Sequence, residues 1–572
     1  MTAPAARRPD VRWVSPPPVD RAAVSALAAE LNLPEVVTEL LCRRGFGTVE
    51  PAKRYLRPRL EQLHEPHQML GLEVGAARIA RAIRDGEPMM VHGDYDVDGM
   101  CSAALLIRAI RAVGGRVTAF IPRRMEDGYD LTMAGVHAAI GAGARLLITC
   151  DCGTNAVEPV AAAMAAGIDV IITDHHLPSG PMPECLAVIN PRQPGCPYPD
   201  KDLAAVGIAF KLALAVYRAL GANDEPVRWM LDLVALATIA DVVPLRGENR
   251  VLARYGLKVM ADTRNVGLRA LLRSAALEGR LLNAGRISFI LAPRLNAVGR
   301  LGHALRGVEL LTTDDERTAN AIARDLEELN LRRQDIDRDI LRQAQVKLES
   351  MDLDATVGIV LAERGWHAGV IGIVANRLVE ELWRPVVLIA LEGEEGKGSG
   401  RSIPAFDLHA GLAACRADLR RFGGHRMAAG LTIDAARVPD FAARFDAIAK
   451  ERLSSADLTP ELRVDLELPL RSATLDLEAL LRHFEPFGAA NATPVLVSRD
   501  VRVSGPPRVV GQGHLKLWLE ADGARVEAIG FGMGTLASEL AAGTALDVAY
   551  RLDRQTWDGE VRLQATLAAL RR

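Results

Sequence analysis

From Gly71 onward the chain alternates short apolar runs with helical patterns, and this alternation restricts the fold more than any other feature. The apolar runs are predicted to be strands, which begin at Met89, Val117, Arg145, Ile168 and Leu186. Helices are predicted between them, including 75–85 and 100–113, and the second of these stops at a Gly-Gly pair. Strands that alternate with helices imply a parallel sheet with right-handed crossovers, so the predicted fold class is α/β.

The first of these strands runs into a cluster of acidic residues. Residues 89–99 read MMVHGDYDVDG, and an extended backbone would place His92, Asp94, Asp96 and Asp98 on one face. Carboxylates this close repel one another, and their pKa values rise unless a cation compensates them. Oxygen ligands with a histidine suit Mg or Mn. The alternative is an acidic surface loop that caps a helix.

Further polar residues stand at comparable positions. Asp151 follows one predicted strand, and Asp174-His175-His176 follows the next. Because ligands bind at the carboxyl edge of such sheets, we expect these side chains to converge on one crevice. Singly, Asp151 could be a helix N-cap and His175 a surface histidine. Asp241 ends an apolar helix, where the helix dipole disfavours a carboxylate, and either a metal ligand or a solvated turn residue would explain it.

Length and composition limit the remaining possibilities. A chain of 572 residues is too long for one core, so several domains are expected. The net charge of −3 means that any nucleic-acid-binding charge must be concentrated in a groove. Seven cysteines without CxxC pairs indicate reduced thiols in a cytoplasm. The N-terminus MTAPAARRPD lacks the apolar stretch of a secretory signal, and no run is long enough to cross a membrane.

The pattern divides the chain into five parts. We predict an N-terminal helical cap on the next domain (1–70), a parallel-sheet domain (71–312), a long connecting helix (313–349), a smaller α/β domain (350–454) and a C-terminal β-barrel of the OB type (455–572). The connecting helix is expected to begin with a capping box formed by Thr313 and Glu316. A coiled-coil dimer is the alternative, but the apolar positions are too irregular to favour it.

Three later stretches suggest binding to an anion or a nucleic acid. Arg294 and Arg300 flank a turn, and guanidinium groups suit phosphate. Gly-rich turns at 398–402 and 422–426 contain Ser, Arg and His and can bring backbone amides to an anion. In the strand 514–519, His514, Lys516 and Trp518 share one face, which suits stacking with single-stranded nucleic acid. A sandwich strand with a polar outer face is an equally good reading.

Four blocks occur in the order found in DHH phosphoesterases, and the chain resembles that superfamily. They are 93–99 (GDYDVDG), 151–153 (DCG), 174–176 (DHH) and 241–245 (DVVPL). Further blocks resemble the RecJ single-strand-specific DNA exonucleases: 121–124 (IPRR), 126–129 (EDGY), 190–194 (NPRQP), 293–297 (PRLNA), 365–367 (GWH), 398–401 (GSGR) and 423–425 (GGH). The resemblance covers residues 70–572 and implies a DHH domain, a long linking helix, a DHH-associated domain and an OB-fold domain around one DNA strand.

The resemblance also implies the cofactors and the residues of the site. Two divalent ions, Mn or Mg, would support two-metal phosphodiester hydrolysis. The implied ligands are Asp96 and the shared Asp151, with Asp94 or His92, at one ion, and Asp98, His175 and Asp241 at the other. His176 would contact the scissile phosphate or protonate the leaving oxygen, and Asp174 would orient a ligand histidine. The implied phosphate-binding residues are Arg124, Arg294, Asn296, Arg300, Ser399, Arg401, Gly424 and His425, of which Arg124, Ser399 and Arg401 would hold a 5′-terminal phosphate.

The implied activity is 5′-to-3′ exonucleolytic hydrolysis of single-stranded DNA in repair and recombination. The resemblance further implies a cytoplasmic monomer, away from membranes, with a single-strand-binding protein and a RecQ-type helicase as partners. One alternative is a DHH phosphodiesterase for very short oligonucleotides or cyclic dinucleotides, although such relatives are shorter and lack the OB-like segment. Another is a non-catalytic DNA-binding scaffold, but scaffolds lose motif acids that this chain keeps. A pyrophosphatase would leave most of the chain unexplained.

Two positions depart from the family pattern. Asp130 stands where family members usually have glycine, and the turn 487–491 (FGAAN) replaces a more usual Gly-x-Gly-Asn. The second change is expected to stiffen that turn.

Overall fold

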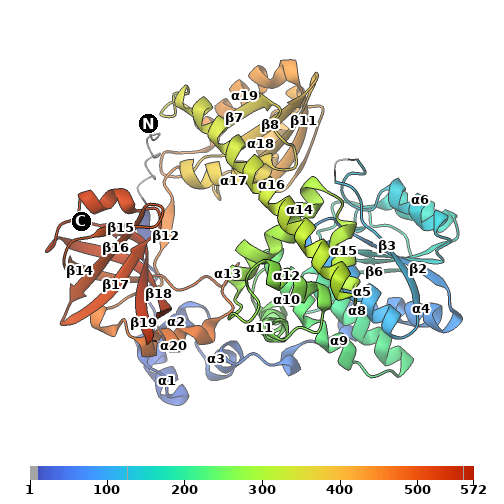
Figure 1. Cartoon of the computed structure of the whole chain (residues 1–572), viewed down its shortest axis with the longest axis horizontal. Coiled ribbons are helices and arrows are strands. Elements are labelled where there is room, and N and C mark those ends of the chain that lie inside the picture. Colours follow the sequence, from blue (N-terminus) through green and yellow to red (C-terminus); the bar gives the residue numbers. More distant parts are fainter. Residues whose placement is uncertain (1–10, 125, 558–559) are drawn as a thin grey trace. The chain divides into compact units, whose positions relative to one another are not determined.

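The computed structural model describes residues 11–124, 126–557 and 560–572. The chain divides into two compact units. Figure 1 shows the whole chain coloured by residue number. The larger unit contains residues 59–454 and 488–491, and the smaller unit contains the described residues up to 58, 455–487 and 492–572. Residues 1–10, on which the expectation about a secretory signal rests, lie outside the described residues.

A five-stranded parallel sheet lies at the centre of the first part of the larger unit (Figure 1). Its order is β3-β2-β4-β5-β6, and every neighbouring pair is parallel. The strands are β2 (Pro88–Gly93), β3 (Arg116–Phe120), β4 (Leu146–Cys150), β5 (Asp169–Thr173) and β6 (Ala187–Ile189). The predicted parallel α/β sheet is therefore confirmed.

Helices cover both faces of this sheet because its buried strands are apolar on both sides. Met89 and Val91 face a core shared with α4 (Leu72–Asp85), α5 (Val97–Ala112), α8 (Ala205–Leu220) and α10 (Leu231–Ala240). Met90, between them, faces a second core formed with α6 (Met133–Gly141) and α7 (Val157–Ala165). The remaining helices of this part are α9 (Glu225–Trp229), α11 (Gly247–Ala261), α12 (Val266–Ser274), α13 (Ala284–Arg286), α14 (Ala292–Leu301) and α15 (Leu305–Thr312), with a π-helical turn at Ile287–Leu291.

The long helix expected after residue 312 is α16 (Glu316–Glu349), which has 34 residues. Its N-cap is Asp315, whose carboxylate accepts a hydrogen bond from the Thr318 amide (2.7 Å), so the expected capping box at Thr313 is wrong. Ile322 and Leu326 belong to the core of the parallel-sheet part. Further along, the Trp366 indole donates a hydrogen bond to Gln343 (2.9 Å). One helix therefore packs into both α/β parts of the larger unit.

The second α/β part has a mixed sheet of order β10-β11-β9-β8-β7. Only the β7–β8 pair is parallel among these strands. The strands are β7 (Ile359–Arg364), β8 (Val386–Glu392), β9 (Glu395–Arg401), β10 (Arg421–Gly424) and β11 (Ala428–Asp434), and the helices are α17 (Ile371–Leu382), α18 (Leu408–Ala414) and α19 (Val438–Arg452).

The smaller unit is built on a seven-stranded sheet of order β13-β14-β18-β19-β17-β16-β15. An additional pairing of β14 with β16 curls the sheet toward a barrel. The strands are β13 (Leu466–Glu467), β14 (Leu496–Val503), β15 (Arg508–Val510), β16 (His514–Ala521), β17 (Ala524–Gly530), β18 (Ala545–Trp557) and β19 (Glu560–Arg571), and α20 spans Leu475–Leu481. Separately, β1 (Arg12–Val14) pairs in parallel with β12 (Glu461–Arg463).

The N-terminal helices share the core of this smaller unit. They are α1 (Arg21–Leu31), α2 (Glu35–Arg43) and α3 (Val49–Leu56). Leu40 and Tyr55 are buried in one cluster with Phe484 and Leu515. We expected residues 1–70 to cap the domain that follows them in sequence. The described residues up to 58 pack instead with the C-terminal sheet, because their apolar stripe finds its partners there.

Candidate active site

The acidic stretch is not extended throughout, as the alternation argument assumed. Strand β2 ends at Gly93, and Asp96 is the N-cap of α5, where its side chain accepts hydrogen bonds from the amides of Asp98 (2.9 Å) and Gly99 (3.1 Å). Asp98 therefore lies in the first helical turn. A Cβ atom on Gly99 would overlap the Asp94 backbone, so glycine is required where the loop folds back on the helix.

This early end of the strand separates His92 from the acids. His92 is fully buried, its Nδ1 lies 3.5 Å from Cys152 Sγ, and its ring packs on Phe120. Burial lowers its pKa to about 4. Asp94 lies with Asp96 and Asp151, whereas His92 belongs to none of the potential ligand groups among the described residues. Of the two side chains considered for the first ion, the geometry therefore favours Asp94 over His92.

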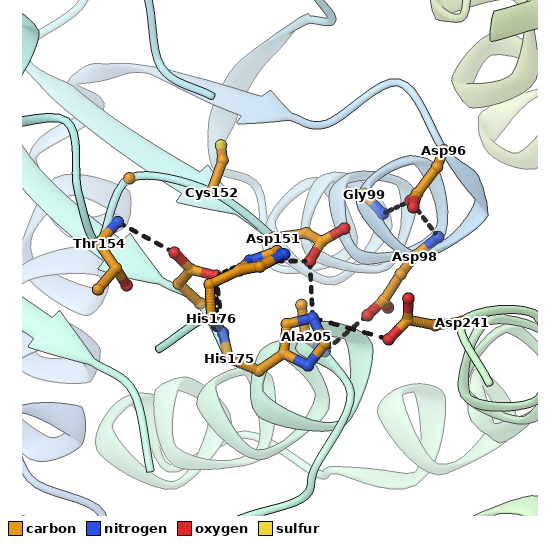
Figure 2. Close-up of polar contacts among 12 residues, drawn as sticks. Asp96, Asp98, Gly99, Asp151, Cys152, Thr154, His175, His176, Ala205 and Asp241 are labelled. Atoms are coloured by element: carbon orange, nitrogen blue, oxygen red, sulfur yellow. Dashed lines mark hydrogen bonds and ion pairs between the residues drawn. The ribbon is translucent and has the colours of Figure 1, made fainter. Parts of the chain in front are cut away.

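Three overlapping groups of potential ligands stand at the carboxyl edge of the sheet. They are Asp94, Asp96 and Asp151; Asp98, His175 and Asp241; and Asp151, His175 and His176. Within each group the ligand atoms lie within 4.8 Å of one another. Figure 2 shows His175 between two carboxylates, with its Nε2 3.1 Å from Asp151 Oδ1 and 3.7 Å from Asp241 Oδ2.

Backbone amides fix the position of Asp98. Its two carboxylate oxygens accept hydrogen bonds from the Ala205 amide (2.7 Å) and the Val206 amide (2.9 Å) at the start of α8 (Figure 2). The backbone is unusual at Asp151, which has a φ of 64° in the left-handed region. Val242, the residue after Asp241, also lies in that region with a φ of 60°. Such strain in residues other than glycine is concentrated at functional sites, where the surrounding structure holds it.

The electrostatics of this cluster favour a bound cation. Burial, and then the charges of neighbouring carboxylates, raise the pKa values of Asp94, Asp151 and Asp241 well above the usual range. The same two causes raise the pKa of Asp98 to about 7. Asp94 Oδ1 and His175 Nδ1 are buried without a hydrogen-bond partner among the described residues. Carboxylate oxygens with one imidazole are a suitable donor set for Mn²⁺ or Mg²⁺, so the residues fit such ions.

A hydrogen-bonded chain runs beside the cluster from Asp174 to Tyr129. Asp174 Oδ1 lies 2.7 Å from His176 Nδ1, and His176 Nε2 lies 3.0 Å from the Tyr129 hydroxyl. Burial lowers the pKa of His176, but the hydrogen bond and charge of Asp174, together with the charges of Asp241 and Asp94, raise that pKa to about 9. We expected Asp174 to orient a ligand histidine, and it holds the His176 ring instead. Sequence reasoning missed Tyr129, because nothing in its residue type distinguishes it within the EDGY block.

Asp130, the departure from the family pattern, occupies a position with a φ of 74°. Glycine is favoured there, but aspartate is among the residues that tolerate it. Its carboxylate accepts hydrogen bonds from the amides of Gly153 (2.6 Å) and Leu131 (2.8 Å). The substitution therefore adds a contact to the loop that carries Asp151. Ala490, in the second departure, likewise has a φ of 55°.

A group of arginines lies on the neighbouring elements of the larger unit. The Arg124 guanidinium lies 4.9 Å from the centre of the Tyr95 ring, and half-buried Arg300 donates a hydrogen bond to the Gly369 carbonyl (2.9 Å). Burial, and then the charges of Arg124 and Arg401, lower the pKa of Arg300 to about 10. Arg401 donates a hydrogen bond to Ser399 Oγ (3.1 Å). Guanidinium groups gathered in this way are suited to bind an anion.

The other predicted phosphate-binding residues are placed differently. Arg294 is paired with the Glu327 carboxylate of α16 (2.5 and 3.1 Å), and a role for it in phosphate binding stays a prediction. Asn296 is half-buried on the same helix, α14. Gly424 ends the exposed strand β10, and the amide of His425 donates a hydrogen bond to the Ala428 carbonyl (2.8 Å).

In the smaller unit, β16 alternates as the sequence predicts. Leu515, Leu517 and Leu519 are buried, while His514, Lys516 and Trp518 are half-buried on the other face. Lys516 is paired with Glu527 (2.9 Å), and the Arg525 guanidinium lies 4.5 Å from the centre of the Trp518 ring. A role in DNA binding for this face stays a prediction.

Across the described ranges, every helix is too short or too polar to cross a membrane.

The parallel sheet and the carboxylate-histidine cluster at its edge define a metal-dependent phosphoesterase of the DHH class. The family model for the DHH family, N-terminal domain, matches residues 88–238, and the model for the DHHA1 domain matches residues 354–451. The model for the RecJ OB domain matches residues 464–569. Together these matches follow the domain order of the sequence prediction.

Whole-chain comparisons identify the family within that class. The chain is 36% identical to the single-stranded-DNA-specific exonuclease RecJ of Bacillus subtilis, covering 97% of this chain and 70% of that protein. It is 35% identical to RecJ of Escherichia coli, covering 93% and 95%. Its fold matches the crystal structure of RecJ in complex with Mn²⁺ from Thermus thermophilus with a TM-score of 0.85 and 32% identity, covering 98% and 80%. The chain belongs to the RecJ family of single-stranded-DNA-specific exonucleases.

Proposed function

We propose that this chain hydrolyses single-stranded DNA from its 5′ end with the help of two divalent ions, Mn²⁺ or Mg²⁺. The observation that supports this most directly is the carboxylate-histidine cluster at the sheet edge, where burial and neighbouring carboxylates raise the pKa of Asp151. Membership of the RecJ family supports the choice of substrate. The arginine group of Arg124, Arg300 and Arg401 supports an end-binding site for the substrate's terminal phosphate.

Six carboxylate and imidazole side chains would hold the ions. We assign Asp94, Asp96 and Asp151 to one ion and Asp98, His175 and Asp241 to the other, with Asp151 close enough to both groups to be shared. Ions held there would neutralise charge on the scissile phosphate and lower the pKa of water. The amides of Ala205 and Val206 keep Asp98 in place throughout.

His176 is proposed to assist the departure of the leaving oxygen. With a pKa of about 9, its ring is protonated at neutral pH, so it can donate a hydrogen bond or a proton to negative charge. Asp174 holds Nδ1, which directs Nε2 toward Tyr129. Tyr129 therefore fixes the direction in which the proton of His176 points.

The polarity of the reaction is proposed to come from the arginine group. Ser399 and Arg401 lie on β9, and the start of α17 packs closely against both side chains. A Cβ atom on Gly372 would lie only 2.8 Å from Ser399 Oγ and 3.0 Å from the Arg401 guanidinium. Arg124 contributes a third donor group, and half-buried Arg300 adds charge. A terminal phosphate offers more negative charge and more acceptor oxygens than an internal one, so this site favours a strand end.

Other properties are proposals that rest on the family. We infer that the protein acts as a monomer in DNA repair and recombination, and that it works in the cytoplasm, where its substrate lies. A single-strand-binding protein and a RecQ-type helicase are the proposed partners. The face of β16 with Lys516 and Trp518 is proposed to contact the strand by stacking and phosphate pairing, with an affinity that falls as salt rises.

The test uses single-stranded DNA of about 30 nucleotides, longer than the footprint of an OB fold, labelled at its 3′ end. With Mn²⁺ or Mg²⁺ we expect products that shorten from the 5′ end, and none with EDTA or on blunt duplex. Asp98→Ala should abolish cleavage and keep DNA binding, whereas the exposed Asp262→Ala should behave as the parent. Cleavage confined to the shortest oligonucleotides would replace the proposal with the short-oligonucleotide phosphodiesterase.

A further inference from the structure

A pocket lies in the larger unit, among residues that the proposed reaction does not use. Its volume is about 580 Å³, within the range of small-molecule sites. It is open to solvent and is lined by the last turns of α5, by α9 and the start of α10, and by the loops before α12 and after α15. Pro226, Met230 and Trp229 provide apolar surface, and Arg108, Arg111 and Arg264 provide charge.

Arg264 and Trp229 form a flat stack at this pocket. The guanidinium carbon lies 3.6 Å from the centre of the indole ring. Arg264 is exposed and has no ion pair with any residue that the structure describes. One face of its guanidinium group is covered by the indole, which leaves the other face for a ligand. Planar guanidinium faces stack on nucleobases and other aromatic rings.

The lining has three arginines and also three acidic residues, Glu225, Asp232 and Asp314. Exposed Glu225 accepts a hydrogen bond from the Trp229 indole (3.3 Å). Arg108 is paired with Asp314 (3.0 Å), so these two largely cancel. Buried Asp232 accepts hydrogen bonds from the Leu233 amide (2.7 Å) and from the Thr263 hydroxyl. Arg111 is exposed and donates only to the Val117 carbonyl (3.3 Å) among the described residues. The donors left available for a ligand therefore come from arginines.

We infer that this pocket binds a nucleoside 5′-monophosphate, with the base against the free face of Arg264 and the phosphate at Arg111. The pocket is large enough for one nucleotide, and it pairs a planar stacking surface with an anion-binding group. The choice of a deoxynucleoside monophosphate rests on the proposed function, because hydrolysis from a 5′ end releases that product. The same chemistry would suit the terminal nucleotide of a strand.

Two helices connect this pocket to the carboxylate-histidine cluster. Helix α5 carries Asp98 in its first turn and Arg108 and Arg111 in its last turns, about 15–20 Å away at 1.5 Å per residue. Helix α10 begins beside the pocket with Asp232 and ends at Asp241. Two helices that present proposed metal ligands thus have their opposite ends at this pocket. A bound product would contact the elements that position those ligands.

Calorimetric titration of the full chain in EDTA tests the inference without hydrolysis. The probes are the four deoxynucleoside 5′-monophosphates, thymidine, inorganic phosphate and a 5′-phosphorylated oligonucleotide. We expect saturable binding of the monophosphates that weakens about tenfold in Arg264→Ala and less in Arg111→Gln. Arg228→Ala, next to Trp229 in sequence but outside the pocket lining, should leave the affinity unchanged. Melting curves establish that each variant is folded.

Arg401→Ala separates this pocket from the proposed end-binding site. Monophosphate binding that survives Arg401→Ala and weakens in Arg264→Ala supports the inference, whether or not the exonuclease assay succeeds. If the oligonucleotide shows the same dependence on Arg264, the pocket accepts the end of a strand as well as the free product. Binding lost in Arg401→Ala but kept in Arg264→Ala would overturn the inference, and so would equal binding of inorganic phosphate or no saturable binding.

Discussion

Two buried clusters of charge in the larger unit are built on opposite principles. In one, Lys211 Nζ donates to Glu248 (2.8 Å) and to the His64 carbonyl (2.7 Å), while the other Glu248 oxygen accepts from the Tyr198 hydroxyl (2.5 Å). Every charge there meets an opposite charge or a hydrogen bond. In the carboxylate-histidine cluster, by contrast, carboxylates lie beside other carboxylates, which raise one another's pKa values. The comparison indicates that the Lys211–Glu248 pair stabilises the fold, whereas the carboxylates at the sheet edge are suited to bind a cation.

The energetic consequences of removing a charge should therefore have opposite signs. A buried ion pair that loses one partner leaves an uncompensated charge, which is strongly destabilising. A carboxylate removed from a group of like charges relieves repulsion and desolvation in the metal-free protein. The two clusters should thus respond differently to substitution.

The largest effect is expected for Asp151→Asn. Turnover should fall by more than about a thousandfold, because the shared ligand is lost. In EDTA the same variant should melt at a higher temperature than the parent, since the raised pKa of Asp151 means that its ionised form costs stability at neutral pH. Assays with Mn²⁺ and melting curves in EDTA measure both. A lower melting temperature in EDTA would show that Asp151 stabilises the folded protein, as the Lys211–Glu248 ion pair is expected to do.

Lys211→Met should act in the other direction. It leaves Glu248 buried without its cation, and the free energy of unfolding should fall by about 3–5 kcal/mol. Urea unfolding measures this, with the exposed Lys258→Met as the control. Adding Glu248→Gln should recover part of the loss, because the unpaired charge is then gone. A single variant as stable as the parent would contradict the contrast between the clusters.

Asp232 is an intermediate case, because its partners are a hydroxyl and an amide. Burial raises its pKa to about 6, above the usual 3.8. A raised folded pKa in a carboxyl group contributes stability below the unfolded pKa and loses it as pH rises through the folded one. Relative to Asp232→Asn, the parent should thus gain up to about 3 kcal/mol between pH 7 and pH 4. Parallel unfolding curves across that window would show it; identical pH profiles would argue against it.

The smallest effect is expected for Asp130→Gly. Glycine relieves the left-handed backbone but removes the acceptor for the Gly153 amide, so stability should change by less than about 1 kcal/mol. Turnover should fall several-fold, because the loop that carries Asp151 loses a contact. Asp130→Asn keeps the acceptor oxygen and should retain more activity than Asp130→Gly. Equal activity of the two variants would mean that the contact does not position Asp151.

Much of the fold was predictable because its signals are local. The apolar runs before Asp151 and Asp174 predicted strands, and the acids after them marked the sheet edge where the structure places them. The length and polarity of 313–349 likewise predicted a long helix. These features depend on periodicity and on the direction of parallel strands, which one sequence contains.

The remaining features depend on partners that are distant in sequence. His92 was grouped with the acids because nothing in the sequence shows that the strand ends one residue later. The pairing of Arg294 with Glu327 is not visible in the sequence, because Glu327 lies on another helix. Tyr129 is significant only through its contact with His176. The core shared by Leu40 and Leu515 joins segments separated by most of the chain.

The length of α16 has a consequence for what the proposed enzyme would release. The helix packs into the core of the parallel-sheet part and also meets the part that carries Ser399 and Arg401. In the proposed mechanism it would therefore set the distance between the phosphodiester bond that is cut and the site that binds the strand end. Each inserted residue would advance the far end by about 1.5 Å and turn it by about 100°. The size of the fragment that the proposed enzyme releases would thus depend on the number of residues in this helix.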